Sequence, residues 1–223
     1  MAEERGTVPD PVTAAQAVFL ECGVHGLVEP HDFGPPTGRG LRCARAVRQG
    51  EVLLEVPLDR AITTETGRAA VLKALGAESV AEAPEAVGRL TGQDFLCLWL
   101  LLEKARGSDS LYATWIANLP VECSEMSAAF WPQAALAELA GCDALVRVEA
   151  LREAIAEAHT RVAQVLGELA ASGAAPFEDV FSEAAYSWAR CVLNSRQFGA
   201  SLLDAKEDCA LVPGADLFNH SCG

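Results

Sequence analysis

Short strands are indicated by two apolar runs, 41–47 and 51–57, separated by a Gln-Gly turn. In the second run Val52, Leu54 and Val56 occupy every other position, which is the period of a strand with one buried face. The turn residues between the runs favour a short connection. The pattern therefore predicts two strands joined by a tight turn.

The middle of the chain shows helical periodicity instead. Thr91 stands three residues before Asp94, the spacing of a capping box, and an apolar stretch follows as far as Arg106. Gly107 then supplies a stop signal. Further along, apolar residues recur at three- and four-residue steps over 148–169, which predicts an amphipathic helix of about 24 residues. A hairpin or small bundle of helices would bury both apolar surfaces.

The remaining elements complete an α+β fold. Short strands are expected at 61–64 and 209–212, and a helix over 181–194. The inner face of that helix is predicted to carry Tyr186, Ala189, Val192 and Leu193. We therefore divide the chain into an N-terminal segment (1–34), a first strand-rich part (35–66), a helical insertion (67–175) and a second strand-containing part (176–223).

Composition narrows the class of function. The apolar fraction of 51% supports a real core, and no apolar run is long enough for a transmembrane helix. The net charge of −14 argues against nucleic acid as a partner, because phosphate neutralisation requires a basic face. The N-terminus carries Glu3 and Glu4 and has no leader pattern. We expect a monomer without membrane or nucleic-acid partners, located in the cytoplasm, the nucleus or both.

The eight cysteines do not form a recognisable metal or redox motif. No Cys-x-x-Cys pair occurs among them, and a reducing compartment would keep them as thiols. Cys22, His25 and His31 form the one local group with ligand-like residues, so a Cys/His metal-binding module stays open as an alternative. Our expectation is that no metal is bound. The four tryptophans, which have no basic residues interleaved, are expected to pack rather than to stack on bases.

Two short stretches could carry chemistry. In the loop at 37–41 (T-G-R-G-L), glycines would let the backbone approach a ligand, although a tight turn explains them equally well. The cluster Asp216-x-x-Asn219-His220 follows a strand and a Pro-Gly turn, where turn capping by Asp216 and Asn219 is the simpler interpretation. His220 and Cys222 lack a third, orienting group for nucleophilic catalysis.

In combination these stretches resemble a known family. T-G-R-G-L followed by GEVLLEVP, then YATWIANLP, YSWARCVLNSRQF and CALVPGADLFNHS, occur in the order typical of SET-domain methyltransferases. The chain is most similar to the branch of the Rubisco large-subunit lysine methyltransferase, and within it to the group of SET domain-containing protein 4. The resemblance spans about residues 35–223.

The resemblance implies S-adenosylmethionine as methyl donor and a protein lysine as acceptor. It assigns cofactor contacts to Thr37, Gly38, Arg39, Arg196, Asp216, Asn219 and His220. Several relatives carry Glu at the position of Thr37. Phe198 is expected to bind substrate: a histidine-methylating relative carries Asn there, which can hydrogen-bond an imidazole, whereas phenylalanine can wall a lysine channel. The alternative is that Phe198 simply packs.

One feature of the family is missing from the chain. The tyrosine that lines the methyl-transfer channel lies downstream of the N-H-S motif, and the chain ends three residues after His220. The only tyrosines, Tyr112 and Tyr186, lie upstream, so no catalytic residue is assigned. We expect a SET domain truncated at its C-terminus, either a methyltransferase of uncertain activity or a non-catalytic, partner-binding derivative.

Overall fold

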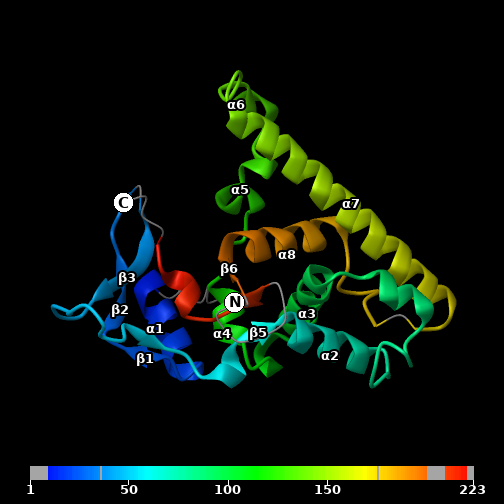
Figure 1. The fold of residues 1–223 in the computed structure, drawn as a ribbon, viewed down its shortest axis with the longest axis horizontal. Coiled ribbons are helices and arrows are strands. Elements are labelled where there is room, and N and C mark those ends of the chain that lie inside the picture. Colours follow the sequence, from blue (N-terminus) through cyan, green and yellow to red (C-terminus); the bar gives the residue numbers. More distant parts are fainter. Residues whose placement is uncertain (1–9, 36, 175, 200–208, 220–223) are drawn as a thin grey trace, which may run out of the picture. The chain divides into compact units, whose positions relative to one another are not determined.

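A computed structural model describes residues 10–35, 37–174, 176–199 and 209–219 (Figure 1). Helices and short strands are both present, as the sequence predicts for an α+β chain. The chain divides into two compact units. Unit 1 comprises residues 1–61, 112–118 and 212–223, and unit 2 comprises 62–111 and 119–211. No helix in the described part of the chain is long and apolar enough to cross a membrane.

The described residues of unit 1 form two small antiparallel strand pairs and two α-helices. Strand β2 pairs with β3, so that Val28 lies opposite Cys43 and Asp32 opposite Arg39, and β1 pairs with β4. The helix α1 begins after Asp10, whose side chain accepts a hydrogen bond from the Thr13 backbone N–H. The elements are α1 (Pro11–Glu21), β1 (His25–Gly26), β2 (Val28–Asp32), β3 (Arg39–Cys43), β4 (Leu54–Glu55), α4 (Ala113–Ala117) and the 3₁₀ turn Ala215–Leu217.

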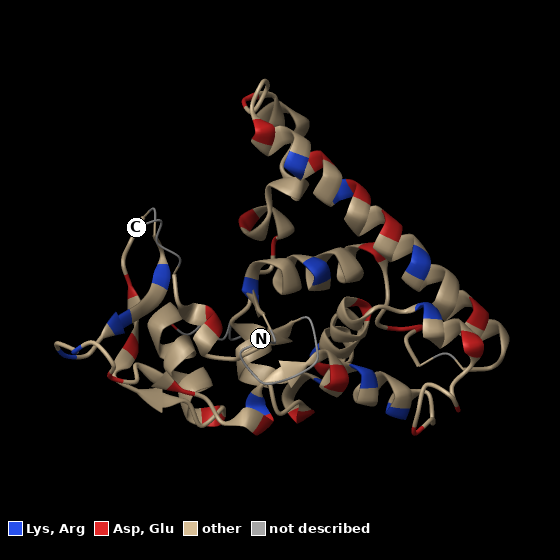
Figure 2. Cartoon of the chain, viewed as in Figure 1, with Lys and Arg blue, Asp and Glu red and all other residues tan. Residues whose placement is uncertain are grey.

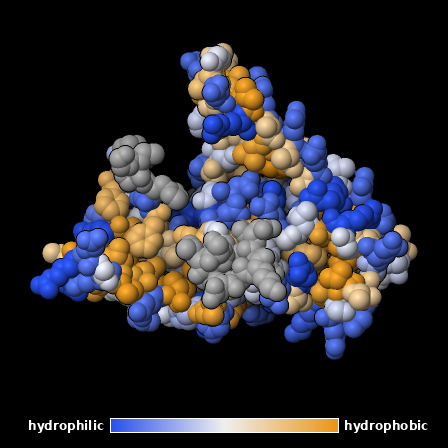
Figure 3. All heavy atoms as spheres, in the orientation of Figure 1, coloured by the Kyte–Doolittle hydropathy of each residue, from blue (hydrophilic) through white to orange (hydrophobic). Residues whose placement is uncertain are grey.

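The predicted strand pair at 41–57 is wrong. Its two strands are not partners: β3 pairs with β2 and β4 with β1, both of which come from the segment before residue 34. Only Leu54–Glu55 of the second run is a strand, and Val52 is 58% exposed rather than buried. Figure 3 shows apolar residues at the surface of this unit. The second run does alternate between apolar and polar residues, but a strand with only two paired residues is too short to form a continuous buried face.

Unit 2 is mainly helical and contains a three-stranded antiparallel sheet in the order β5-β7-β6. The register places Ile62 and Gln197 on either side of Leu211. The predicted strands at 61–64 and 209–212 are therefore confirmed in shortened form. The elements are β5 (Ile62–Thr63), α2 (Thr64–Ala74), α3 (Gly92–Arg106), α5 (Cys123–Met126), α6 (Gln133–Ala137), α7 (Asp143–Ala171), α8 (Glu183–Arg196), β6 (Gln197–Phe198) and β7 (Ala210–Leu211).

The helices follow the sequence signals closely. Thr91 and Asp94 form the predicted capping box of α3, which ends at Arg106 with Gly107 as its C-cap. The long helix α7 begins at Asp143, a turn earlier than the apolar period indicates, and its ribbon carries acidic and basic residues along its length (Figure 2). All four predicted inner-face residues of α8 are buried. The helices α2 and α8 both pack on α3, and α7 packs on α8, so the four helices form a small bundle in which α8 packs against both predicted apolar helices.

A buried carboxylate joins three helices of this bundle. The side chain of Asp94 is fully buried; it accepts hydrogen bonds from the Tyr186 hydroxyl at 2.7 Å and from the Arg161 guanidinium at 2.9 Å. It also accepts from the hydroxyl and backbone N–H of Thr91, which completes the cap. Burial raises the pKa of Tyr186, so that its hydroxyl remains a donor.

Three of the four tryptophans pack as expected: Trp99, Trp115 and Trp188 are buried. Trp131 packs only in part: it is 39% exposed and donates its indole N–H to the Ser124 carbonyl. The Lys104 ammonium lies over the Trp188 ring, 3.7 Å from the ring centroid, in a cation–π contact.

Alkaline pH is expected to destabilise unit 2 through Cys97. Burial raises the pKa of this thiol from 9.0 to about 12, so the folded chain holds a proton that the unfolded chain releases. Its contribution is complete below pH 9 and is lost as pH rises toward 12. Between pH 9 and 11 the free energy of unfolding should fall by about 2 kcal/mol from this group alone.

Urea unfolding at a series of pH values measures this effect. Cys97→Ala should flatten the alkaline slope by up to about 1.4 kcal/mol per pH unit. Cys43→Ala removes an exposed thiol and should leave the slope unchanged. Equal slopes for the wild type and Cys97→Ala would contradict the prediction.

Candidate functional site

The stretch T-G-R-G-L spans the end of the β2–β3 turn and the start of β3 in unit 1: Thr37 and Gly38 belong to the turn, and residues 39–41 begin β3. The Phe33 backbone N–H donates to the Gly38 carbonyl at 2.9 Å, and the Gly38 N–H donates to the Gly34 carbonyl at 2.8 Å. Both glycines have positive φ, +69° at Gly34 and +68° at Gly38, which side chains disfavour. Thr37 at the tip is exposed, and no atom lies within 4 Å of where a Cβ on Gly38 would stand. The turn interpretation is confirmed, and the backbone at Gly38 is accessible.

The guanidinium of Arg39 is held by the end of α4. Its two terminal nitrogens donate to the Asn118 side-chain oxygen at 3.0 Å and to the Asn118 backbone carbonyl at 2.9 Å. The amide nitrogen of Asn118 donates in turn to the carbonyls of Ala14 and Thr114. The Arg39 side chain thus anchors the loop to two helices of its own unit.

The loop lies directly against the second predicted motif. Gly40 is buried, and a Cβ placed on it would stand 2.9 Å from the Asn219 side-chain carbon and nearer still to its amide nitrogen. Glycine at position 40 leaves room for the Asn219 amide, which any larger side chain would displace. Residues 40 and 219 are therefore brought into contact from opposite ends of the chain.

Asp216 holds the turn that precedes Asn219. One carboxylate oxygen accepts the Gly214 N–H at 2.9 Å, and the other accepts the Trp115 indole N–H at 3.0 Å. The turn-capping interpretation of Asp216 is therefore confirmed. Gly214 has a φ of +87°, and a Cβ placed on it would stand 3.0 Å from a methyl carbon of Val24. Asn219 is exposed, and its side chain reaches Gly40.

The remaining predicted residues lie elsewhere. Arg196 ends α8 and Phe198 belongs to β6, both in unit 2, where Phe198 pairs with Ala210. Both side chains are half-buried. His220 lies outside the described residues, as does Cys222.

The three possible metal ligands grouped by the sequence, Cys22, His25 and His31, do not form a metal site in the described part of unit 1. Cys22 is buried, and burial raises the pKa of its thiol despite the opposing charge of Arg60. His25 is exposed; hydrogen bonds to the Gly23 carbonyl and to Glu55 raise its pKa. His31 lies edge-on to the Phe33 ring. Within the described ranges no three His, Cys, Asp or Glu side chains form a group that could hold a metal ion.

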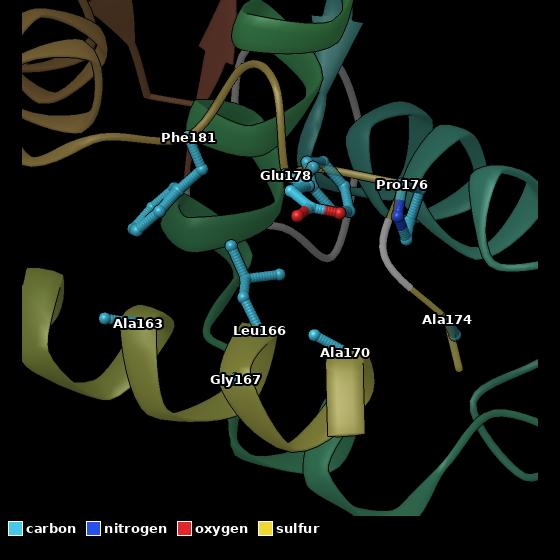
Figure 4. Close-up of a pocket in the computed structure, with 9 residues that line it drawn as sticks. Ala163, Leu166, Gly167, Ala170, Ala174, Pro176, Glu178 and Phe181 are labelled. Atoms are coloured by element: carbon cyan, nitrogen blue, oxygen red, sulfur yellow. The ribbon is translucent and has the colours of Figure 1, made fainter. Parts of the chain in front are cut away.

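A cavity of about 290 Å³ lies in unit 2 between α7 and residues 174–181 (Figure 4). Leu166 and Phe181 face this space, and Glu178 is the charged side chain on its wall. None of the predicted site residues that the structure describes lines it. A single carboxylate beside apolar and small side chains offers no acid–base pair. We therefore do not consider this cavity a candidate catalytic site.

Sequence reasoning missed three residues that build the site of unit 1: Gly40, Trp115 and Asn118. Gly40 was inside a recognised loop, but its need for glycine depends on Asn219. Trp115 and Asn118 were inside the recognised stretch YATWIANLP. A polar Asn in that apolar stretch was a usable signal, although nothing local identifies Arg39 as its partner.

No protein-family model matches the chain. Among curated proteins it is 28% identical over 193 residues to SET domain-containing protein 4 of Mus musculus, which covers 84% of this chain and 42% of that protein. It is also 28% identical over 190 residues to the [fructose-bisphosphate aldolase]-lysine N-methyltransferase of Arabidopsis thaliana, covering 83% and 34%. The chain thus spans less than half the length of the curated relatives it matches.

Solved structures agree on the fold. A structure of Rubisco LSMT bound to AdoMet aligns with a TM-score of 0.74 at 24% identity, covering 97% of this chain and 46% of that one. The LSMT SET domain bound to lysine and AdoHcy aligns with a TM-score of 0.75 at 23% identity, with the same coverage. In sequence the chain is similar to SET domain-containing protein 4 and to named lysine N-methyltransferases, and it shares the fold of the Rubisco LSMT SET domain.

Proposed function

We propose that this chain supplies the cofactor-binding part of an S-adenosylmethionine-dependent protein-lysine N-methyltransferase. The observation that carries the proposal is the contact in unit 1 between the T-G-R-G-L loop, at Gly40, and Asn219. These are the two segments that match the family's cofactor motifs. Relatives at 28% identity include a named protein-lysine methyltransferase, which supports the same assignment.

The residues of unit 1 fit such a cofactor. S-adenosylmethionine has an amino acid end and a purine end, both rich in groups that hydrogen-bond to backbone and amide atoms. Gly38 presents bare backbone with open space above it, and the exposed Asn219 offers both a donor and an acceptor. Thr37, Gly38 and Arg39 would bind through the backbone, since the Arg39 guanidinium is engaged by Asn118.

The bound cofactor would supply an electrophilic methyl group, and the chain would supply position and environment. Binding through a pre-formed turn orients the donor without further ordering of the loop. Asp216 fixes the turn that precedes Asn219, and His220 is assigned to the cofactor by resemblance. Arg196 is assigned to the cofactor, and Phe198 to the acceptor, by resemblance. A phenylalanine beside the acceptor favours lysine, because an apolar wall disfavours the ammonium and so promotes loss of its proton.

Other parts of the proposal rest on composition. A protein substrate bearing the target lysine, and a basic one in particular, suits the net charge of −14. The same charge makes nucleic acid an unfavourable partner. The seven described cysteines are free thiols, in keeping with a cytoplasmic or nuclear location. We propose further that the chain acts as a monomer without a membrane partner.

Thermal unfolding with and without S-adenosylmethionine tests the proposal. At a concentration of 100 times Kd the ligand should add about 2.7 kcal/mol of stability, or about 5 to 11 °C in Tm. Asn219→Ala should abolish the shift, because it removes the amide that faces the loop. Gln133→Ala removes an exposed amide in unit 2 and should retain it.

No shift in a cooperatively melting wild type would contradict cofactor binding. If the chain binds the cofactor, transfer of a radiolabelled methyl group to an added lysine-rich protein distinguishes an active methyltransferase from a non-catalytic, partner-binding protein. Binding with transfer supports the enzyme, whereas binding without transfer favours the non-catalytic alternative.

A further inference from the structure

We propose that α4 positions the cofactor segments, with Trp115 and Asn118 as its positioning residues. The inference rests on the function proposed above and concerns the same site. Neither residue is assigned to the cofactor; each acts through a residue of a motif. Both belong to unit 1, as do all their partners described here.

Asn118 fixes the first motif. It follows the last residue of α4, and its own amide is oriented by two acceptors, the carbonyls of Ala14 in α1 and Thr114 in α4, at 3.1 and 2.8 Å. That leaves the side-chain oxygen and the backbone carbonyl to receive the Arg39 guanidinium. A hydrogen bond to a charged donor is among the stronger polar contacts, and here two are made to one residue.

Trp115 fixes the second motif. Its indole is buried, with 2% of its surface exposed, and its N–H donates to the Asp216 carboxylate at 3.0 Å. Asp216 also accepts the Gly214 N–H, so its carboxylate links the indole to the turn that leads into Asn219. A buried indole N–H aimed at a carboxylate sets the position of the turn more firmly than a solvent-exposed contact would.

The two residues lie on one side of a short helix. Positions 115 and 118 are three apart, which places them on the same helical face. Through them α4 contacts Arg39, next to Gly40, and Asp216, three residues before Asn219. Because Gly40 packs against Asn219, a shift of either segment by a few tenths of an ångström would disturb their contact.

The affinity for S-adenosylmethionine, measured by titration calorimetry, tests the positioning. Asn118→Ala and Trp115→Phe should each raise Kd by about tenfold. Trp188→Phe is the matched control: that buried indole also donates one hydrogen bond, to the Pro120 carbonyl at 2.9 Å in unit 2, and its loss should change Kd by less than about twofold.

Asn118→Asp separates positioning from general stability. An aspartate keeps the oxygen that receives Arg39, but it faces the carbonyls of Ala14 and Thr114 without a donor. Its Tm should therefore fall at least as far as that of Asn118→Ala, while its Kd stays within about threefold of the wild type. A Kd as poor as that of Asn118→Ala would overturn the inference.

Hydrogen exchange keeps the inference testable if the wild type binds no S-adenosylmethionine, which would contradict the proposed function. The N–H groups of Phe33 and Gly38 are hydrogen-bonded within the loop. Asn118→Ala should accelerate their exchange, and Asn118→Asp should not. Unchanged exchange in Asn118→Ala, or accelerated exchange with an unchanged Kd in a chain that does bind, would overturn the positioning role.

Discussion

Asp94→Ala is expected to lower the free energy of unfolding by about 3 to 5 kcal/mol. The substitution leaves the Arg161 guanidinium and the Tyr186 hydroxyl without their shared acceptor and also removes half of the capping box of α3. Removing one member of a buried ionic network costs more than the network contributes as a whole, because the remaining polar groups stay desolvated. Urea unfolding followed by circular dichroism measures the change.

Asp143→Ala provides the control for this prediction. Asp143 also lies in the first turn of a helix, α7, but it is exposed. Its contribution comes mainly from the helix dipole, so the expected loss is below about 1 kcal/mol. Comparable losses for the two variants would show that Asp94 acts only as a helix-terminal charge and that its contacts to Arg161 and Tyr186 contribute nothing.

Gly40→Ala is expected to weaken S-adenosylmethionine binding by about one to two orders of magnitude while leaving the fold intact. The new methyl group would occupy the space of the Asn219 amide, with the Phe33 ring edge 3.2 Å away. Both neighbouring side chains are exposed and can move, so the free energy of unfolding should change by less than about 1 kcal/mol. The cost appears in binding, because the displaced amide no longer faces the ligand.

Calorimetric titration and thermal unfolding together decide this prediction. Gly167→Ala in α7 is the control, since no atom lies within 4 Å of a Cβ there and alanine favours a helix. That variant should bind like the wild type. Wild-type affinity in Gly40→Ala would mean that Asn219 does not contribute to the cofactor site; a large loss of stability would mean that the close approach at Gly40 supports the fold instead.

The helices show how far local signals reach. Capping, periodicity and stop residues act over three to four positions, so α3 was predicted from Thr91 to Gly107, and α7 and α8 to within a turn or so. The prediction failed for the strands of unit 1 because the local sequence does not identify which segment each strand pairs with. An alternating run becomes a strand only where another segment meets its edge, and β1 and β2 lie in a segment for which no element was predicted.

For the candidate site, the sequence by itself determined the chemical groups and their order: a glycine-rich turn, a helix over 181–194 followed by Arg196, and an Asp-x-x-Asn motif after a Pro-Gly turn. Only the tertiary structure decided which groups meet. Arg39 and Asn118 are 79 residues apart, Trp115 and Asp216 are 101 apart, and Gly40 contacts Asn219 from the other end of the chain. Such contacts form only when the whole unit folds and packs, because their partners are far apart in the sequence. The residue types that make them, in contrast, are given directly by the sequence at each position.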